Sequence, residues 1–336
     1  MPELVVLDHL TLADGELFHD RKGRVCALPR PLAPLADTHG HLTSFKGHDP
    51  ALALARAALV GVRLLVVPVD PVSEIPGTWP DVAALLAWLD DQVETAHECL
   101  EECAEQGFAP PAFDGYGAPD LLDNVRIVAG AHPYGAEGLD EAALARLDEL
   151  LESPRAVGVG EIGLDFGPYA PASPEVQERA FRRQLEVARE RRLPVELHIR
   201  DAAGDVCVGA HRDLARILGE LGVPEAGCDL HCFTSGVRVM EDFARLGCHM
   251  AFGGALTFSR SDDIRKAAAF CPERLLLSET DCPYMAPVPL RGEEGEPAMV
   301  AFTVARLADV RADVGRASRQ ATYDALWRNA RAFFSV

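Results

Sequence analysis

The sequence predicts an α/β protein built around one barrel of eight parallel strands, and three observations lead to that expectation. From residue 35 onward, apolar strand-like runs alternate with longer amphipathic segments, a pattern typical of a parallel sheet with crossover helices. Eight such runs can be recognised. The length of 336 residues suits one barrel with insertions. The expected architecture is a TIM (β/α)8 barrel, whose functional side chains gather at the carboxyl ends of its strands.

The eight expected strands are short and apolar. They span residues 35–37, 63–69, 125–131, 156–161, 194–198, 228–231, 249–253 and 275–279. Residues 1–34 precede them and are interpreted as an N-terminal extension packed on the barrel. Strand-like runs at 4–7 and 25–28 flank turn-forming residues at 20–23 in this extension. The barrel domain is expected to cover residues 35–336.

The helical segments differ in length. Ser173 followed by Pro174 indicates an N-cap and a first helical residue, which predicts a helix to about Arg192. A longer helix is expected over 79–106, within an insertion of about residues 70–123 in the second β/α unit. We interpret this insertion as a solvated decoration in preference to a lid or an oligomer contact. Closing helices are expected at 297–308 and 316–333.

The chain is strongly acidic. Lys+Arg 32 against Asp+Glu 52 gives a formal net charge of −20, which disfavours wrapping a long nucleic acid around a basic surface. A phosphate-bearing substrate would have to be bound locally, by metal ions and a few arginines. The most apolar window, residues 51–69, is interrupted by Arg56 and Arg63, so a helix followed by a buried strand explains it better than a membrane span.

Cysteine usage and the first residues of the chain predict a cytoplasmic location. There are nine cysteines, an odd number without a Cys-x-x-Cys pair. Glu3 stands where a signal peptide would carry basic residues. Reduced thiols in a cytosol are the expectation that follows.

Histidines and carboxylates stand at the ends of several expected strands. His39 and His41 are two residues apart on an extended backbone, so their imidazoles point to the same side. Such a pair fits either a metal site or structural histidines, and later strand ends decide between the two. They add two more histidines and two carboxylates: Glu161, His198, His231 and Asp281.

Four histidines and two carboxylates at the strand ends of one barrel favour a shared site. Six nitrogen and oxygen ligands are too many for one tetrahedral zinc ion. They suit two divalent ions bridged by a carboxylate and a water molecule. Glu161 is the natural bridging residue.

Several motifs carry a family resemblance. The strings ADTHGHL, GAHPY, GVGEIGLDF, LPVELHIRDA, LHCFTSG and LLLSETDCPYMAP, followed by RNARAFF, occur in this order over roughly residues 35–335. Together they resemble the TatD family of metal-dependent deoxyribonucleases in the amidohydrolase superfamily. The resemblance implies a TIM barrel that hydrolyses DNA phosphodiesters with two divalent ions, Mg²⁺, Mn²⁺ or Zn²⁺. It also implies six metal ligands: His39, His41, Glu161, His198, His231 and Asp281.

The same resemblance implies roles for neighbouring residues. His132 in GAHPY and Arg200 after His198 are expected to bind a substrate phosphate, together with Arg260 in TFSR. Asp281 is expected to accept or orient the proton of the attacking water, with Glu161 as its catalytic companion. Arg291 is interpreted as a surface or helix-cap residue.

Further carboxylates are expected to support the ligands. Strand alternation places Glu196 beside His198 and Arg200, and Asp229 beside His231, where the family usually has an apolar residue at the position of Glu196. We expect these two to pair with Arg200 or to accept the free N–H groups of the histidines. Asp37, Asp165 and Glu279 are assigned to the same supporting shell.

Two cysteines are adjacent to expected ligands. Strand alternation turns Cys232 away from His231 and toward the helices. Both Cys232 and Cys282 are therefore expected to pack as small apolar residues.

Three functions remain open from the sequence. The leading one is a deoxyribonuclease that cleaves single-stranded DNA or 3′ ends, or a small phosphodiester. The second retains the metal site but hydrolyses an ester or an amide, such as D-aminoacyl-tRNA. The third is a metal-binding barrel without turnover. Gly295 replaces an asparagine typical of the family within the acidic loop 293–296, and an acidic rim repels a polyanion. The sequence leaves the oligomeric state open.

Overall fold

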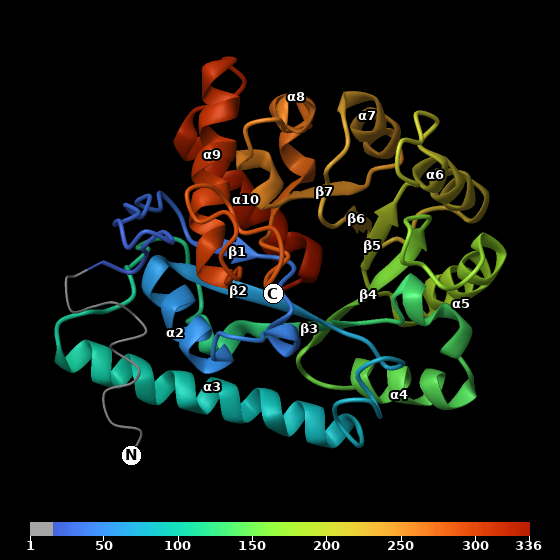
Figure 1. The fold of residues 1–336 in the computed structure, drawn as a ribbon, viewed down its shortest axis with the longest axis horizontal. Helices are drawn as coiled ribbons and strands as arrows, with labels where there is room; N and C mark the ends of the chain where they lie inside the picture. The colour runs from blue at the N-terminus through green and yellow to red at the C-terminus, as the bar shows by residue number, and fades with distance from the viewer. Residues whose placement is uncertain (1–15) are drawn as a thin grey trace.

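The computed structural model describes residues 16–336, and its eight parallel strands form one sheet in the order β1 to β8. The predicted TIM barrel is confirmed (Figure 1). Each predicted strand corresponds to an observed one, with bounds that differ by a few residues. The strands are β1 Leu35–Asp37, β2 Val62–Val69, β3 Val125–Ala129, β4 Ala156–Asp165, β5 Val195–Arg200, β6 Cys228–Leu230, β7 His249–Phe252 and β8 Leu276–Ser278.

The barrel closes between its first and last strands through backbone hydrogen bonds. The amide of Thr38 donates to the carbonyl of Ser278 at 3.0 Å, and the amide of Asp281 donates to the carbonyl of His39 at 2.9 Å. The amide of His41 reaches the carbonyl of Cys282 at 2.7 Å. The seam therefore places the His-x-His segment directly beside Asp281.

Helices surround the strands, and their positions follow the sequence signals (Figure 1). The α-helices are α2 Pro50–Val60, α3 Val82–Glu105, α4 Glu141–Leu151, α5 Pro174–Arg191, α6 Gly209–Leu221, α7 Val237–Arg245, α8 Asp262–Phe270, α9 Val300–Asp313 and α10 Arg319–Phe334. Short 3-10 helices lie at η2 Leu42–Ser44, η3 Leu122–Asn124, η4 Pro133–Gly138, η5 Gly254–Thr257, η6 Glu273–Leu275 and η7 Pro297–Met299.

Two helices show how local signals and packing set the boundaries. Helix α5 begins at Pro174, as predicted. The segment predicted as a helix over 297–308 instead begins as η7 and continues as α9 to Asp313. The turn of α9 beyond residue 308 is stabilised by hydrogen bonds to its neighbour α8. Buried Arg311 donates to the carbonyls of Ala268 and Cys271 near the end of α8, each at 2.9 Å.

The insertion in the second unit contains α3, which lies along the lower edge of the molecule in Figure 1, next to α2. Asp81 caps it by accepting the amide of Ala84 at 2.8 Å. In the N-terminal extension, the ring of Phe18 packs edge-on against Phe302 at 5.5 Å. The predicted run at 4–7 lies outside the described residues. At 25–28 only an isolated antiparallel bridge, between His19 and Val25, is formed.

The core has two main parts. The larger cluster fills the space between the strands and the surrounding helices. A second cluster joins apolar strand residues such as Leu64, Val66 and Leu277 to Trp327 and Phe333 of α10. Apolar packing thus rigidifies the barrel beneath its strand ends. Between residues 16 and 336, every helix is too short or too polar to cross a bilayer.

Candidate metal centre

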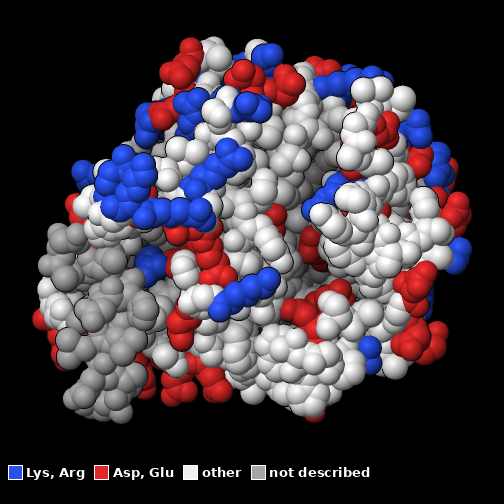
Figure 2. Space-filling view, viewed as in Figure 1, with Lys and Arg blue, Asp and Glu red and all other residues white. Residues whose placement is uncertain are grey.

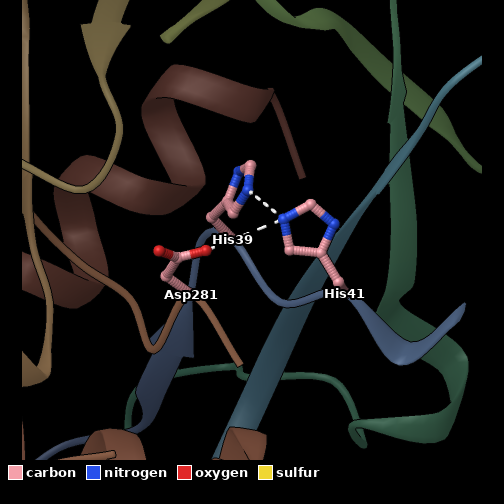
Figure 3. A group of neighbouring side chains, drawn as sticks. All are labelled: His39, His41 and Asp281. Carbon is pink, nitrogen blue, oxygen red and sulfur yellow. Dashed lines mark hydrogen bonds and ion pairs between the residues drawn. The ribbon is translucent and has the colours of Figure 1, made fainter. Parts of the chain in front are cut away.

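His39 and His41 follow β1, and Figure 3 shows their rings converging beside Asp281. The Nε2 atoms of the two histidines lie 3.1 Å apart, and His41 Nε2 lies 3.7 Å from Asp281 Oδ1. On the other side of the His39 ring, Nδ1 lies 3.1 Å from Glu196 Oε2. With its proton on Nδ1, facing this carboxylate, the ring presents the Nε2 lone pair to His41 and Asp281.

Glu161 lies between two sets of imidazoles. Its Oε2 atom is 3.9 Å from His39 Nε2 and 3.7 Å from His41 Nε2. Its Oε1 atom is 2.7 Å from His198 Nδ1 and 2.9 Å from His231 Nε2. One carboxylate thus faces both sets, which is the arrangement expected of a bridging ligand.

His198 is held from behind by Asp165. The Nε2 atom of His198 lies 2.9 Å from Asp165 Oδ2, while Nδ1 faces Glu161 and lies 3.1 Å from His231 Nε2. Asp165 is fully buried and also accepts the amide of Gly167 at 2.7 Å. This carboxylate therefore orients the imidazole so that Nδ1 points into the site.

The donor set fits divalent cations. When His39 and His198 carry their protons on the nitrogens that face Glu196 and Asp165, their other nitrogens present lone pairs toward the carboxylate of Glu161. Lone pairs and a carboxylate at such distances repel one another unless positive charge lies between them. Among residues 16–336, three groups of side chains could hold a metal ion, and within each group the possible ligand atoms lie within 4.8 Å of one another. The groups are His39, His41 and Asp281; His39, Glu161 and His231; and His132, Asp165 and His198.

The third of these groups is a hydrogen-bonded pair rather than an open set of ligand atoms, because the Nε2 atom of His198 already faces Asp165 as a hydrogen-bond partner. The first two groups share His39 and include five of the six predicted ligands. The sixth, His198, lies in contact with Glu161 and His231. The structure therefore brings all six predicted ligands together.

Burial and neighbouring charges set the protonation of the site. Burial is the main cause that holds the pKa of His39 well below its usual value, so this imidazole stays neutral and able to bind a cation. Burial raises the pKa of Glu161, but His132, His231 and His198 outweigh that effect and hold it well below its usual range. Burial lowers the pKa of His198, whereas contacts with Asp165 and Glu161 raise it to about 9, so this imidazole must release the proton on Nδ1 before that nitrogen can bind a cation.

A cavity of about 1050 Å³ opens above these side chains. Figure 2 shows a hollow on this face with acidic atoms inside it. His132 lines the cavity, and its Nδ1 atom accepts the amide of Tyr134 at 3.1 Å. Burial lowers the pKa of His132 to about 3, so the neutral ring carries its proton on Nε2, 3.5 Å from Glu161 Oε1. Its N–H therefore points into the site.

Arg200 also lines the cavity and is half exposed. Its Nη1 atom donates to the hydroxyl of Tyr134 at 3.0 Å and lies 3.6 Å from Asp165 Oδ2. The structure thus brings His132 and Arg200 together. It does not bring Arg260 to them, because Arg260 is exposed after η5 and is not among the residues that line this cavity. Arg291 lies over the ring of Phe258, with 4.2 Å between its guanidinium carbon and the ring centroid.

The expectation for Cys232 is wrong. Its side chain lines the cavity instead of facing the helices. The reason is that β6 ends at Leu230, and Cys232 has a left-handed backbone with φ 47°. Strand alternation no longer applies there. Burial, followed by Asp281 and Glu279, raises the pKa of the Cys232 thiol well above its usual value, so it stays a thiol. Cys282 is fully buried.

The supporting carboxylates are buried beneath the site. Asp37 accepts both the amide of Thr280 at 2.8 Å and its hydroxyl at 2.6 Å, which connects β1 to the loop after β8. Burial raises the pKa of Asp37 to about 8. Glu196 faces His39, as its expected role requires, but Arg200 contacts Asp165 instead of Glu196 or Asp229.

Glu279 and Asp229 complete this buried layer. Glu279 Oε1 accepts the amide of Cys232 at 2.5 Å. Both carboxylate oxygens of Asp229 lack a hydrogen-bond partner among residues 16–336. Burial is the main cause that raises the pKa of each carboxyl group well above its usual value. These two carboxyl groups are therefore held in their protonated, uncharged form unless a cation lies close to them.

Sequence reasoning missed four residues of the site. Two buried glutamines of α5, Gln177 and Gln184, bind the backbone of Asp165 and Ala131 and so hold two strand ends in place. They are seven residues apart and therefore lie on one face of α5. Two polar residues on the buried face of an amphipathic helix are the sequence signal that could have identified them. Tyr134 and Tyr284 line the cavity. Both tyrosines follow ligand motifs in GAHPY and TDCPY.

Fold and site together define a barrel hydrolase whose strand ends present a metal-binding set of histidines and carboxylates. A family model described as TatD related DNase matches residues 36–335. The chain belongs to the TatD family of metal-dependent hydrolases.

Relatives agree with this assignment. The chain is 32% identical over 227 residues to the uncharacterized metal-dependent hydrolase YabD of Bacillus subtilis, a match covering 66% of this chain and 85% of the relative. It is 32% identical over 190 residues to a Citrobacter koseri protein named 3'-5' ssDNA/RNA exonuclease TatD, covering 55% and 70%. The crystal structure of YJJV, a TatD homolog from Escherichia coli, matches with a TM-score of 0.67 and 25% identity, covering 91% of this chain and 99% of that one.

Proposed function

We propose that this protein is a two-metal phosphodiesterase that acts on single-stranded nucleic acid, with DNA 3′ ends as its leading substrate. The observation that carries the proposal is the position of Glu161, whose two oxygens face separate sets of histidines. Two divalent ions would be held by His39, His41, Glu161, His198, His231 and Asp281. The names of some relatives, which describe single-stranded DNA and RNA exonucleases, support this substrate class.

Each polar group around the centre has a role in the proposed hydrolysis. Divalent ions bound there would lower the pKa of a coordinated water and polarise the phosphate. Asp281 accepts the proton of the attacking water. Burial raises the pKa of this carboxyl group, which makes it a better proton acceptor. The Nε2–H of His132 and the guanidinium of Arg200 offset the charge that develops on the phosphate oxygens.

The supporting residues fix the orientation of these groups. Glu196 sets the proton of His39 on Nδ1, and Asp165 holds His198 so that Nδ1 faces Glu161. Asp37 connects the seam on which His39 and Asp281 stand. Preorganised ligands of this kind retain their geometry during the reaction, which is the main protein contribution in metal-assisted hydrolysis.

An assay with four substrates tests the proposal. A 5′-fluorescent single-stranded oligonucleotide, its duplex, bis(p-nitrophenyl) phosphate and a D-aminoacyl-tRNA are each incubated with Mg²⁺, Mn²⁺ or Zn²⁺. We expect a ladder of oligonucleotide products shortened from the 3′ end, together with slower cleavage of the duplex. Release of the D-amino acid alone would instead support the ester or amide hydrolase.

Two controls make the result specific. The His132→Asn variant removes the N–H aimed at the phosphate and should reduce kcat/KM for the oligonucleotide by about 10²-fold. Metal content is measured by mass spectrometry on each preparation. A protein that holds two ions per chain and leaves all four substrates intact would contradict the proposal and favour a binding barrel without turnover.

A further inference from the structure

A serine, a histidine and an aspartate form a hydrogen-bonded chain in the wall of the same cavity, apart from the metal ligands. The hydroxyl of Ser235 lies 3.3 Å from His211 Nε2, and His211 Nδ1 lies 2.7 Å from Asp201 Oδ2. All three residues line the cavity. This connectivity is that of a Ser-His-Asp triad, which is recognised by geometry and roles in unrelated folds.

The aspartate performs two tasks at once. Its Oδ1 atom accepts the amide of Ala210 at 2.9 Å and that of His211 at 3.3 Å, at the beginning of α6. Its Oδ2 atom remains for the imidazole. The carboxylate thereby fixes the proton of His211 on Nδ1, which leaves the Nε2 lone pair directed at the hydroxyl of Ser235.

The backbone around these residues supports a defined geometry. His211 is buried in the first turn of α6, and its ring packs edge-on near Phe243 at 6.1 Å. The residue before α6, Val208, has φ 49°, a left-handed conformation that is costly for a β-branched side chain. Such strain persists where surrounding structure imposes it, and it concentrates at functional sites.

Ser235 is positioned to react with a ligand in the cavity. It is partly exposed and stands two residues before α7, which begins at Val237 without a side-chain cap. The first-turn amides of a helix have no partner within the helix, and the helix dipole favours negative charge beside them. The first-turn amides of α7 follow Ser235 directly in the sequence, and they are the candidate donors for the oxygen anion of an acyl-transfer step.

We infer that Ser235, His211 and Asp201 form a second reactive centre, which transfers the acyl group of a small carboxylic ester to Ser235. The Oγ atom attacks the carbonyl carbon while His211 Nε2 takes its proton. The tetrahedral intermediate then expels the alcohol, which receives that proton. Water attacks the acyl-serine with His211 again as the base, which releases the acid and restores Ser235. The balance is ester plus water to acid plus alcohol. This inference does not rest on the proposed phosphodiesterase activity.

Covalent labelling of the metal-loaded protein tests the inference. A fluorophosphonate probe reacts with nucleophilic serines and releases fluoride. We expect one adduct per chain by intact-mass spectrometry, located at Ser235 by peptide mapping. Serine-to-alanine substitution, Ser235→Ala, should abolish it. Absence of an adduct in the wild-type protein, or an adduct elsewhere only, would overturn the inference.

Variants of the two partners separate reactivity from structure. Asp201→Asn retains an oxygen that can cap α6 but no longer accepts the His211 N–H as a carboxylate. Its labelling rate should fall at least about 100-fold with an unchanged thermal midpoint. His211→Gln should slow labelling at least as much. The matched control is Thr234→Val, which removes the neighbouring hydroxyl and should retain the wild-type rate. Equal rates in the wild-type protein and His211→Gln would refute the assignment.

The Asp281→Asn variant keeps the two proposals distinguishable. Asp281 is not part of the Ser235 chain, so its loss should leave the labelling rate unchanged while phosphodiester hydrolysis stops. Labelling that disappears with Asp281→Asn would show that the reactive serine depends on the metal centre and would overturn a separate centre. The result of the cleavage assays therefore tests the phosphodiesterase, and the result of the labelling assay tests the Ser235 centre.

Discussion

Both ring nitrogens of His39 and of His198 make contacts that matter for the site. His39 faces Glu196 with Nδ1 and His41 with Nε2. His198 faces Asp165 with Nε2 and the cavity with Nδ1. The two histidines therefore use opposite nitrogens toward the same centre, and a carboxylate selects the nitrogen in each case.

Asp281 is the residue for which we expect the largest loss of activity. Asp281→Asn retains the shape of the side chain but removes the negative charge that accepts a proton. We expect turnover of a phosphodiester to fall by at least about 10³-fold, with an unchanged far-ultraviolet circular dichroism spectrum. Steady-state kinetics at saturating Mn²⁺ measure the effect. Retention of more than a tenth of the wild-type kcat would exclude Asp281 as the proton acceptor.

Arg200 is expected to act through its planar fork. Arg200→Lys retains the charge but cannot form two parallel bonds to a phosphate, so KM for a phosphodiester should rise about 5- to 10-fold with a smaller change in kcat. Arg183→Lys makes the same change on the exposed surface of α5, beside Glu186, and serves as the control. A KM equal to that of the control would mean that Arg200 does not bind the phosphate.

Among the elements, α5 has a role beyond covering the barrel. Gln184 accepts the amide of Ala131 at 2.6 Å and donates to its carbonyl at 3.1 Å, directly before His132. Gln177 makes the equivalent pair of bonds to the backbone of Asp165, at 2.7 and 2.8 Å. The helix thus holds the ends of β3 and β4 that carry site residues.

Substitution of Gln184 measures this contribution. Gln184→Met retains the length of the side chain but leaves two buried backbone groups without partners, so the free energy of unfolding should fall by about 2 kcal/mol. Urea denaturation of both proteins gives the difference. Gln106→Met, at an exposed position after α3, should change stability by less than about 0.5 kcal/mol. Equal stabilities of the two variants would show that the bonds to Ala131 contribute nothing.

At the scale of the whole barrel, the predicted ligands come from strands that are distant in sequence. The His-x-His segment after β1 meets Asp281 after β8, and Glu161 lies within β4. Cations bound between them would connect opposite sides of the barrel and should stabilise the folded state. Free Mn²⁺ at a hundred times its dissociation constant should raise the free energy of unfolding by about 2.7 kcal/mol.

Thermal unfolding with and without Mn²⁺ measures this stabilisation. Glu161→Gln removes the charge that faces both sets of histidines, so the shift in the midpoint should largely disappear in this variant. The physical reason is that a neutral amide does not compensate two divalent charges. An undiminished shift in Glu161→Gln would place the stabilising ions elsewhere on the protein.

Net charge sets a second property of the whole molecule. A basic nucleic-acid binder with several phosphate contacts loses affinity steeply as salt rises, because counterions are released on binding. This chain carries a formal charge of −20 and meets a substrate with few cations. Between about 20 and 200 mM NaCl, kcat/KM for a short oligonucleotide should therefore change by less than about threefold or increase. A decrease of tenfold or more would indicate an extended basic contact surface.

Sequence patterns were sufficient for the barrel and for the expectation that the six predicted ligands lie close together. Alternating apolar runs predicted eight strands, and the observed strands follow them within a few residues. The gathering of the six residues at the strand ends follows from the parallel arrangement alone, since carboxyl ends of parallel strands share one face. Local capping chemistry predicted the beginning of α5 at Pro174.

Only the tertiary structure showed which side chains outside the regular strands reach the cavity. Cys232 lines the cavity because strand β6 ends before it, and Arg260 stays outside because its loop is directed to solvent. Sequence determined which residues stand at strand ends, because that depends on local pattern. Which nitrogen of each histidine faces the centre, and which serine meets His211, depends on contacts between distant segments, and only the closed barrel brings those segments together.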